Sequence, residues 1–99
     1  MLRHIVTWNY KDGFSEAENK ENAIRIKREL EELFHRIGGI IEMNVHINEL
    51  SSSNQDLILN SLFESAEALV DYQSHPEHVT ISAFVSSTMQ NRACIDYYE

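Results

Sequence analysis

Residues 72–79, YQSHPEHV, hold the only proline of the chain together with one tyrosine and two of the five histidines. Pro76 is favoured as the first residue of a helix, which would place His78 in the first helical turn. The unpaired backbone amides and the positive end of the helix dipole disfavour an imidazolium there, so we expect His78 to be neutral. A neutral imidazole can take a proton from carbon or oxygen, and the hydroxyl of Tyr72 can bind the carbonyl or enolate oxygen. The pair therefore predicts proton abstraction beside a carbonyl group, including aldol cyclisation, with no cofactor.

The same residues also fit two other roles. In a capping device, the imidazoles of His75 and His78 would bind backbone groups at a helix corner while the ring of Tyr72 packs in the core. In a metal site, His75 and His78 would share a helix face with His4 nearby. A single HxxH lacks the paired ligand spacing of a zinc site, so we expect no metal ion here.

The composition restricts the function classes. The chain has 99 residues, 42% hydrophobic and 24% charged, which is typical of one packed domain over residues 1–99. Sixteen acidic and eight basic residues give a formal net charge of -8, which disfavours nucleic acid and anionic membranes as partners. Residues 1–4 continue into a strand pattern without a signal-type apolar segment, so we expect a cytoplasmic protein. Cys94 is the single cysteine, and its apolar and aromatic surroundings predict a buried, inert thiol.

Hydrophobic periodicity predicts the elements that position these residues. Residues 2–11, LRHIVTWNYK, have the β-branched and aromatic content of a strand. Its alternation puts His4, Val6, Trp8 and Tyr10 on one face and Ile5, Thr7 and Asn9 on the other. Because both faces carry sizeable side chains, this strand needs cover on both sides, which predicts a dimer.

A long helix follows the first strand. Ser15 and Glu18 have the spacing of the reciprocal capping box. Apolar residues then recur at spacings of three and four up to the stop at residues 38–39, which predicts a helix of about twenty residues. The apolar stripe consists of Ala23, Ile26, Leu30, Leu33 and Ile37, widened by Ile24 and Phe34. About two heptads are too few for a coiled coil.

The remaining chain completes a β-α-β-β-α-β order. We predict strands over residues 40–49, 56–64 and 92–98, and helices that begin at Ser65 and Pro76. In the strand 40–49, the alternation predicts a buried face made of Ile41, Met43, Val45 and Ile47. This order is the ferredoxin-like α+β fold, an antiparallel four-stranded sheet with its helices on one face. Two copies that stack their bare sheet faces would form a dimeric barrel.

The chain resembles the stress-responsive dimeric α+β barrel family, often called Dabb, over essentially its whole length. The segments that carry the resemblance are Arg3-His4-Ile5-Val6, Phe63-Glu64-Ser65, residues 72–79 and Cys94-Ile95-Asp96-Tyr97. The resemblance implies a homodimer of ferredoxin-like subunits. The family includes plant stress proteins and a plant polyketide cyclase that closes an aromatic ring by aldol condensation. The catalytic tyrosine and histidine of that cyclase match Tyr72 and His78, and one of its pocket histidines matches His4.

Three function classes remain open. The first is a cofactor-free cyclase or lyase that uses His78 and Tyr72, with His4 orienting or polarising the substrate. Further candidates for lining its pocket, which would bind a small hydrophobic ligand, are Val6, Trp8, Ile81 and Cys94. The second class is a non-catalytic stress-responsive or ligand-binding dimer, and the third is a monooxygenase-like barrel protein, by fold analogy. A cavity beside His78 and Tyr72 favours the first class, and a filled interior favours the second.

Overall fold

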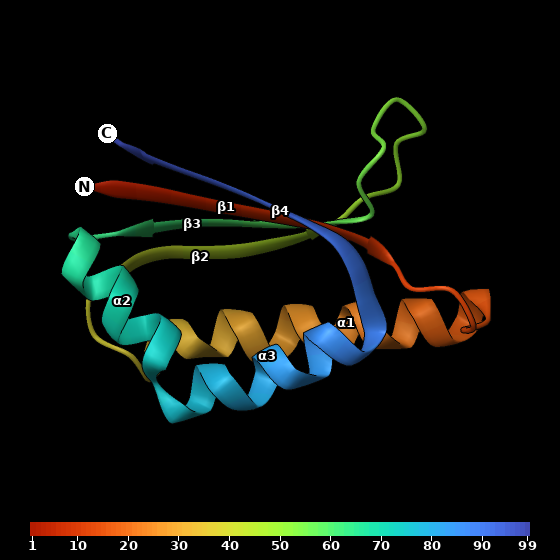
Figure 1. Cartoon of the computed structure of the whole chain (residues 1–99), viewed down its shortest axis with the longest axis horizontal. Helices are drawn as coiled ribbons and strands as arrows, with labels where there is room; N and C mark the ends of the chain where they lie inside the picture. The colour runs from red at the N-terminus through yellow and green to blue at the C-terminus, as the bar shows by residue number, and fades with distance from the viewer.

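The computed structural model describes the whole chain, residues 1–99, and its elements follow the predicted order (Figure 1). The strands are β1 (Leu2–Tyr10), β2 (Ile40–Ile47), β3 (Leu57–Phe63) and β4 (Met89–Tyr98). The helices are α1 (Glu16–Glu32), the 3-10 turn η1 (Leu33–His35), α2 (Ala66–Ser74) and α3 (Pro76–Thr88). None of the helices combines the length and the apolar composition that a membrane span requires.

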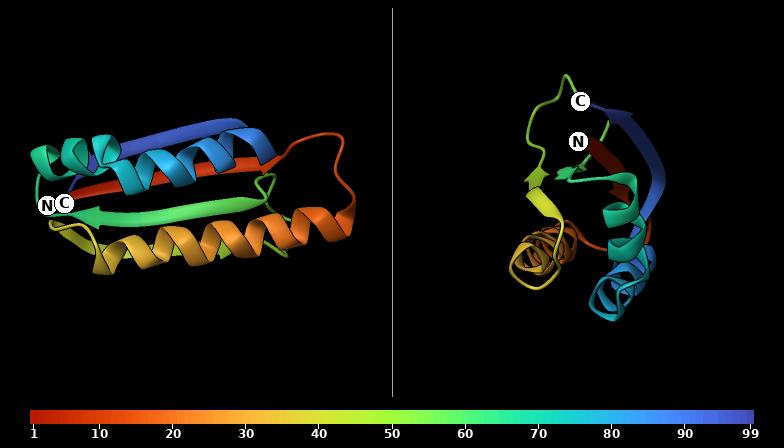
Figure 2. Two further views of the ribbon diagram at one scale, coloured as in Figure 1. Left: turned by 90° about the horizontal axis from the view of Figure 1, so that it is seen from below. Right: turned by 90° about the vertical axis from the view of Figure 1, so that its left-hand side faces the viewer.

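The four strands form one antiparallel sheet in the order β2-β3-β1-β4. All three α-helices lie on one face of this sheet, and the end-on view in Figure 2 shows the opposite face bare. The two termini lie side by side, because the backbone N–H of Glu99 donates to the carbonyl oxygen of Met1 over 2.9 Å. The predicted ferredoxin-like fold is confirmed.

The core lies between the sheet and the helices. His4, Val6 and Trp8 on β1 point into it and are only 2–7% exposed, as the alternation predicts. The capping box at the start of α1 forms in both directions: Ser15 N–H donates to Glu18 over 2.9 Å, and Glu18 N–H donates to the Ser15 hydroxyl over 3.1 Å. The start of the longest helix is thus determined by its local sequence.

The buried stripe of α1 is narrower than predicted. Ala23, Ile26 and Leu30 are at most 2% exposed, whereas Ile24 and Phe34 are 46% and 42% exposed. Ile24 follows Ala23 by one residue, which turns its side chain about 100° away from the buried row. Phe34 lies in η1, where the tighter winding changes the direction of the side chains.

A β-bulge changes the buried face of β2. Ile40 pairs with Phe63, and the next paired residue, Glu42, lies opposite Leu62. Ile41 is therefore an extra residue, and it is 36% exposed, whereas Ile40 is 7% exposed. The prediction that Ile41 is buried is wrong because strict alternation does not anticipate the inserted residue.

The bare face of the sheet is mixed: polar Asn60 lies across from Ile5 and Asn44 lies across from Asn60, and an apolar patch lies on β1, β3 and β4. Ile5 pairs with Ile95 across β1 and β4, and Thr7 pairs with Ile58 across β1 and β3. Ile95 and Tyr97 are 56% and 47% exposed in the single chain. The sequence predicts that a second subunit covers this face, because both faces of the first strand carry sizeable side chains.

A substitution of Gly39 tests how closely the connection between η1 and β2 packs against α2. It has a φ of +85°, and a Cβ there would lie 2.7 Å from the Cβ of Ala68. We expect Gly39→Ala to lower the free energy of unfolding by about 2–5 kcal/mol, because the backbone strain and the overlap add. Gly13→Ala is the matched control, since Gly13 has a φ of +100° but no atom within 4 Å, and it should lose about 1–2 kcal/mol. Equal losses in denaturant unfolding would contradict the close packing.

Candidate functional site

A one-residue break between α2 and α3 brings the tyrosine and the histidine together. α2 ends at Ser74, α3 begins at Pro76, and His75 between them is extended, with φ -64° and ψ 133°. A residue before proline is disfavoured in the helical region, and proline has no N–H with which to continue the preceding helix. The chain therefore turns, and the rings of Tyr72 and His78 lie with their centroids 4.3 Å apart.

The two histidines of this segment differ in their hydrogen bonds. Nδ1 of His75 accepts a hydrogen bond from the backbone N–H of Glu77 over 3.1 Å, which caps α3 and leaves the proton of the neutral ring on Nε2. Nδ1 of His78 lies 3.1 Å from the backbone carbonyl oxygen of Gln73. Because a carbonyl oxygen only accepts, Nδ1 of His78 carries the proton and Nε2 is the basic nitrogen. Both imidazoles thus bind backbone groups at the helix corner, as the capping hypothesis predicts, and His78 also keeps Nε2 free for chemistry.

Burial controls the protonation of both stacked rings. Burial lowers the pKa of His78 below its ordinary value of 6.5, and the hydrogen bond to Gln73 opposes this effect only in part. Burial also raises the pKa of the Tyr72 hydroxyl above its ordinary value of 10, and this side chain is 1% exposed. At neutral pH, a neutral imidazole therefore lies beside a protonated hydroxyl.

His4 on β1 is held by a carboxylate. It is the cross-strand partner of Asp96 on β4, and its Nδ1 lies 2.5 Å from Oδ1 of Asp96. The carboxylate accepts a hydrogen bond from Nδ1–H of His4, so Nε2 is the ring nitrogen that this contact leaves free. The ring of His4 packs edge-on against Phe63 at 6.1 Å, and Phe63 in turn packs against Tyr72 at 5.0 Å. A continuous row of rings thus joins β1 to the helix corner.

These rings line a small cavity between the sheet and the helices. Its volume is about 90 Å³, which admits a few water molecules or a compound of few atoms and is below the usual size of a pocket for a drug-sized ligand. Five of the candidate residues meet there, namely His4, Val6, Trp8, Tyr72 and His78. The residues that sequence reasoning missed are Leu30, Leu59, Gln73, Ser82, Val85, Ser86 and Arg92.

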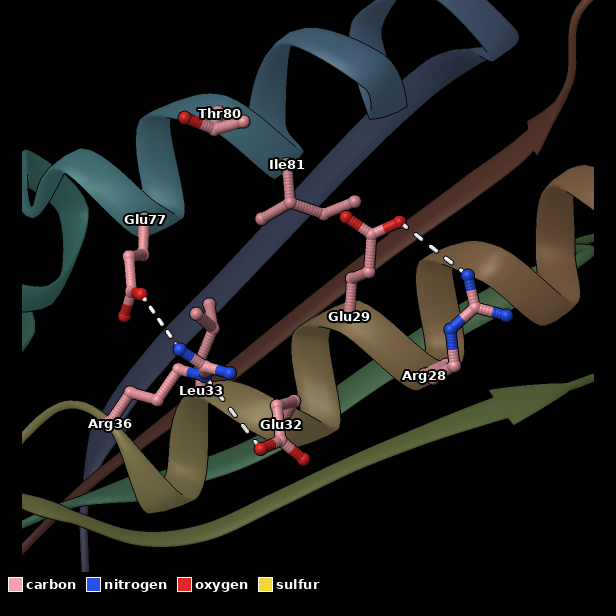
Figure 3. A pocket seen from close by; sticks show the side chains of 8 residues that line it. All are labelled: Arg28, Glu29, Glu32, Leu33, Arg36, Glu77, Thr80 and Ile81. Carbon is pink, nitrogen blue, oxygen red and sulfur yellow. Dashed lines mark hydrogen bonds and ion pairs between the residues drawn. The ribbon is translucent and has the colours of Figure 1, made fainter.

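The other two candidates lie outside this cavity. Ile81 is 3% exposed and lines a separate groove between α1 and α3 (Figure 3). Cys94 is exposed, so the prediction of a buried thiol is wrong for the single chain. The reason is its place on β4, an edge strand on which residues 91–99 are all exposed. Apolar neighbours in sequence do not bury a side chain when nothing packs over the strand.

The groove between α1 and α3 is larger, about 410 Å³, but its charges are compensated. Arg36 donates to Glu77 over 3.1 Å and lies 3.7 Å from Glu32 (Figure 3). Arg28 lies 3.9 Å from Glu29. Exposed pairs of this kind contribute little to stability, and they leave no free charge with which the groove could select an ion.

His4, Cys94 and Asp96 form the one cluster whose side chains are close enough to share a metal ion, with ligand atoms within 4.8 Å of one another. Sγ of Cys94 lies 3.8 Å from Nδ1 of His4 and 3.7 Å from both carboxylate oxygens of Asp96. Two of these atoms, Nδ1 of His4 and Oδ1 of Asp96, are within hydrogen-bond distance of each other. His75 and His78 do not belong to this cluster.

The Dabb family model, described as the stress responsive A/B barrel domain, matches residues 2–99. The chain belongs to the Dabb family. This confirms the resemblance drawn from the sequence. A dimeric ferredoxin-like protein of unknown function from Bacteroides fragilis is 28% identical to this Dabb chain, with a TM-score of 0.92 over 99% of this chain and 95% of that chain.

Two more distant structures share the fold alone. A dimeric ferredoxin-like protein of unknown function from Thermobifida fusca is 17% identical, with a TM-score of 0.83 over 99% of this chain and 90% of that chain. The hydroxynitrile lyase from Passiflora edulis is 15% identical, with a TM-score of 0.79 over 97% of this chain and 90% of that chain. No curated protein matches the sequence.

Substitutions of His75 test whether this residue caps α3 and so stabilises the fold. We expect His75→Ala to lower the free energy of unfolding by about 0.5–2 kcal/mol, because the N–H of Glu77 loses its acceptor. His75→Asn should recover most of this loss, since the Asn side-chain oxygen can accept the same N–H. Denaturant unfolding of both variants measures the difference, and an unchanged stability of His75→Ala would show that the cap contributes nothing.

The lowered pKa of His78 makes stability depend on pH. The unfolded chain protonates this histidine near its ordinary value of 6.5, and the folded chain does so only at lower pH. The free energy of unfolding should therefore fall as the pH decreases below about 6.5, until the pKa of the folded state is reached. His78→Gln should flatten the part of the stability profile that lies below about pH 6.5. Identical profiles for the variant and the wild type would argue against a depressed pKa.

Proposed function

We propose that this Dabb protein is a cofactor-free enzyme of the lyase or cyclase type that moves a proton beside a carbonyl group in a small substrate. The observation that carries the proposal is the contact between His78 and Tyr72, 4.3 Å apart on the wall of one cavity. One ring offers a basic nitrogen and the other a hydroxyl donor. Acid and base groups paired in this way suit proton transfer to and from a carbonyl compound.

His78 acts as the base in this proposal. Its Nε2 takes a proton from the carbon next to the carbonyl group, and the electron pair of that C–H bond forms the C=C bond of an enolate. The carbonyl oxygen of Gln73, which already accepts a hydrogen bond from Nδ1–H, stabilises the imidazolium that results. Because burial keeps the pKa of His78 low, the basic form is already dominant at neutral pH.

Tyr72 and His4 act on the substrate oxygen. The hydroxyl of Tyr72 donates a hydrogen bond to the enolate oxygen, and its raised pKa keeps the proton in place for this purpose. His4, whose ring orientation is maintained by Asp96, lines the same cavity and orients the oxygen from the other side. The enolate then attacks an electrophilic carbon or takes the proton back from His78.

The cavity volume and the similar structures limit the proposal. A volume of about 90 Å³ suits a substrate of few atoms better than an extended polyketide. The hydroxynitrile lyase from Passiflora edulis supports the compatibility of this fold with lyase chemistry. We also propose that the active form is a homodimer joined through the bare sheet face, because the similar ferredoxin-like proteins are dimeric and that face exposes the apolar side chains of Ile95 and Tyr97.

A non-catalytic ligand-binding dimer is the second candidate. It is favoured by the near-complete burial of Tyr72, at 1% exposed, and by the small size of the cavity. In that case, the rings of Tyr72 and His78 would serve mainly to pack the helix corner against β3.

A proton-exchange assay distinguishes the cofactor-free enzyme from the non-catalytic dimer without knowledge of the natural substrate. The wild-type protein should accelerate deuterium uptake from D2O into small ketones and β-dicarbonyl compounds, from acetone to methyl acetoacetate, followed by proton NMR. We expect His78→Ala to reduce the rate by about 10²–10⁴-fold and Tyr72→Phe by about 10²-fold, because each removes one of the paired groups.

His75→Asn is the matched control, since it changes the neighbouring histidine but keeps the cap, and it should retain the wild-type exchange rate. A wild-type protein that leaves the exchange rates of all these compounds unchanged would overturn the enzyme proposal in favour of the binding dimer. Full activity of His78→Ala would overturn the assignment of His78 as the base.

A further inference from the structure

Arg92 is an exposed residue of β4 that lines the cavity, and it lies beside an irregularity in the pairing of β1 and β4. Thr7 pairs with Ala93 and Asn9 pairs with Gln90, so two residues of β4 lie opposite one residue of β1. Asn91 has a positive φ of 55° at this point. A bulge of this kind redirects the adjacent side chains, and Arg92 lines the cavity together with Tyr72 and His78.

The guanidinium of Arg92 has no carboxylate partner. Each of the other arginines forms an ion pair with a glutamate, namely Arg3, Arg25, Arg28 and Arg36. The cavity lining contains no aspartate or glutamate, although the chain has sixteen acidic and only eight basic residues. Lys11 and Lys20 also form no ion pair, but neither lines this cavity, so Arg92 is the one cation of its lining and has no carboxylate partner there.

The protonation of the neighbouring groups is consistent with this position. Burial raises the pKa of Tyr72, and the charge of Arg92 opposes that effect. Burial lowers the pKa of His78, and the charge of Arg92 lowers it further, together with His4 and His75. The positive charge thus acts on both groups at the centre of the cavity.

We infer that Arg92 binds a carboxylate of the substrate, so that the substrate class is a small oxo acid. The inference rests on the proposed function of the same cavity. The guanidinium fork matches the two oxygens of a carboxylate, while Tyr72 binds the carbonyl oxygen and His78 takes the proton from the adjacent carbon. Three side chains from α2, α3 and β4 then recognise three parts of one small molecule.

A matched pair of probes tests the anion site. Acetoacetate and its neutral methyl ester differ in the carboxylate, and both can be titrated into ¹⁵N-labelled wild-type protein and followed by NMR shifts of residues around the cavity. We expect acetoacetate to bind at least about tenfold more tightly than the ester. Arg92→Gln should remove most of this preference, and Arg92→Lys should retain part of it, because it keeps the charge but loses the fork.

Lys20→Gln is the control for charge, because Lys20 is exposed on α1 and its loss changes the net charge equally. It should leave the preference for acetoacetate unchanged. The inference would be overturned if the wild type bound both probes equally, if neither probe shifted the resonances around the cavity, or if Lys20→Gln acted like Arg92→Gln.

The two proposals fail in different ways. His78→Ala should slow proton exchange by about 10²–10⁴-fold but keep the preference for acetoacetate. A wild-type protein that prefers acetoacetate without exchanging its protons would support the anion site and contradict the proposed function. Proton exchange with no preference for acetoacetate over its ester would support the proposed function and contradict the anion site. As a measure of proximity without any ligand, Arg92→Gln should raise the pKa of His78 in an NMR titration, and an unchanged pKa would place Arg92 away from the cavity.

Discussion

The break between α2 and α3 at His75-Pro76 is the constraint on which the candidate site depends. In one continuous helix, Tyr72 and His78 would be six residues apart along the chain and about 120° apart around the axis, so their rings would not meet. Pro76 ends the first helix and starts the second, and the two rings stack with centroids 4.3 Å apart. A single residue that cannot donate a backbone hydrogen bond therefore determines which side chains share the cavity.

The backbone and the carboxylates around this corner then determine which ring nitrogens are free. A carbonyl oxygen binds Nδ1 of His78 and a carboxylate binds Nδ1 of His4, so both rings keep Nε2 available. Burial keeps His78 neutral and Tyr72 protonated. Arg92 adds a positive charge to a cavity without carboxylates, in a chain whose net charge is -8. The result is a small site with one base, several donors and no anion of its own.

Local patterns were sufficient to predict the fold and five of the twelve residues that line the cavity. The capping box at Ser15, the alternation of β1 and the proline corner each involve residues close in sequence, and all are present in the structure. The exposure of Ile41 and Cys94 and the position of Arg92 could not be predicted, because they depend on bulges and on the pairing of distant strands. The contact between His4 and Asp96 joins residues 92 positions apart, and nothing local encodes that register.

The protonation state of His78 tests the account most directly. Chemical shifts of the imidazole nitrogens in ¹⁵N-histidine-labelled protein at pH 7 should show His78 as the neutral form with its proton on Nδ1, and His75 as the opposite tautomer. This result would leave Nε2 of His78 as a base beside Tyr72. An imidazolium at pH 7, or a proton on Nε2, would contradict the role of His78 as the base of this site.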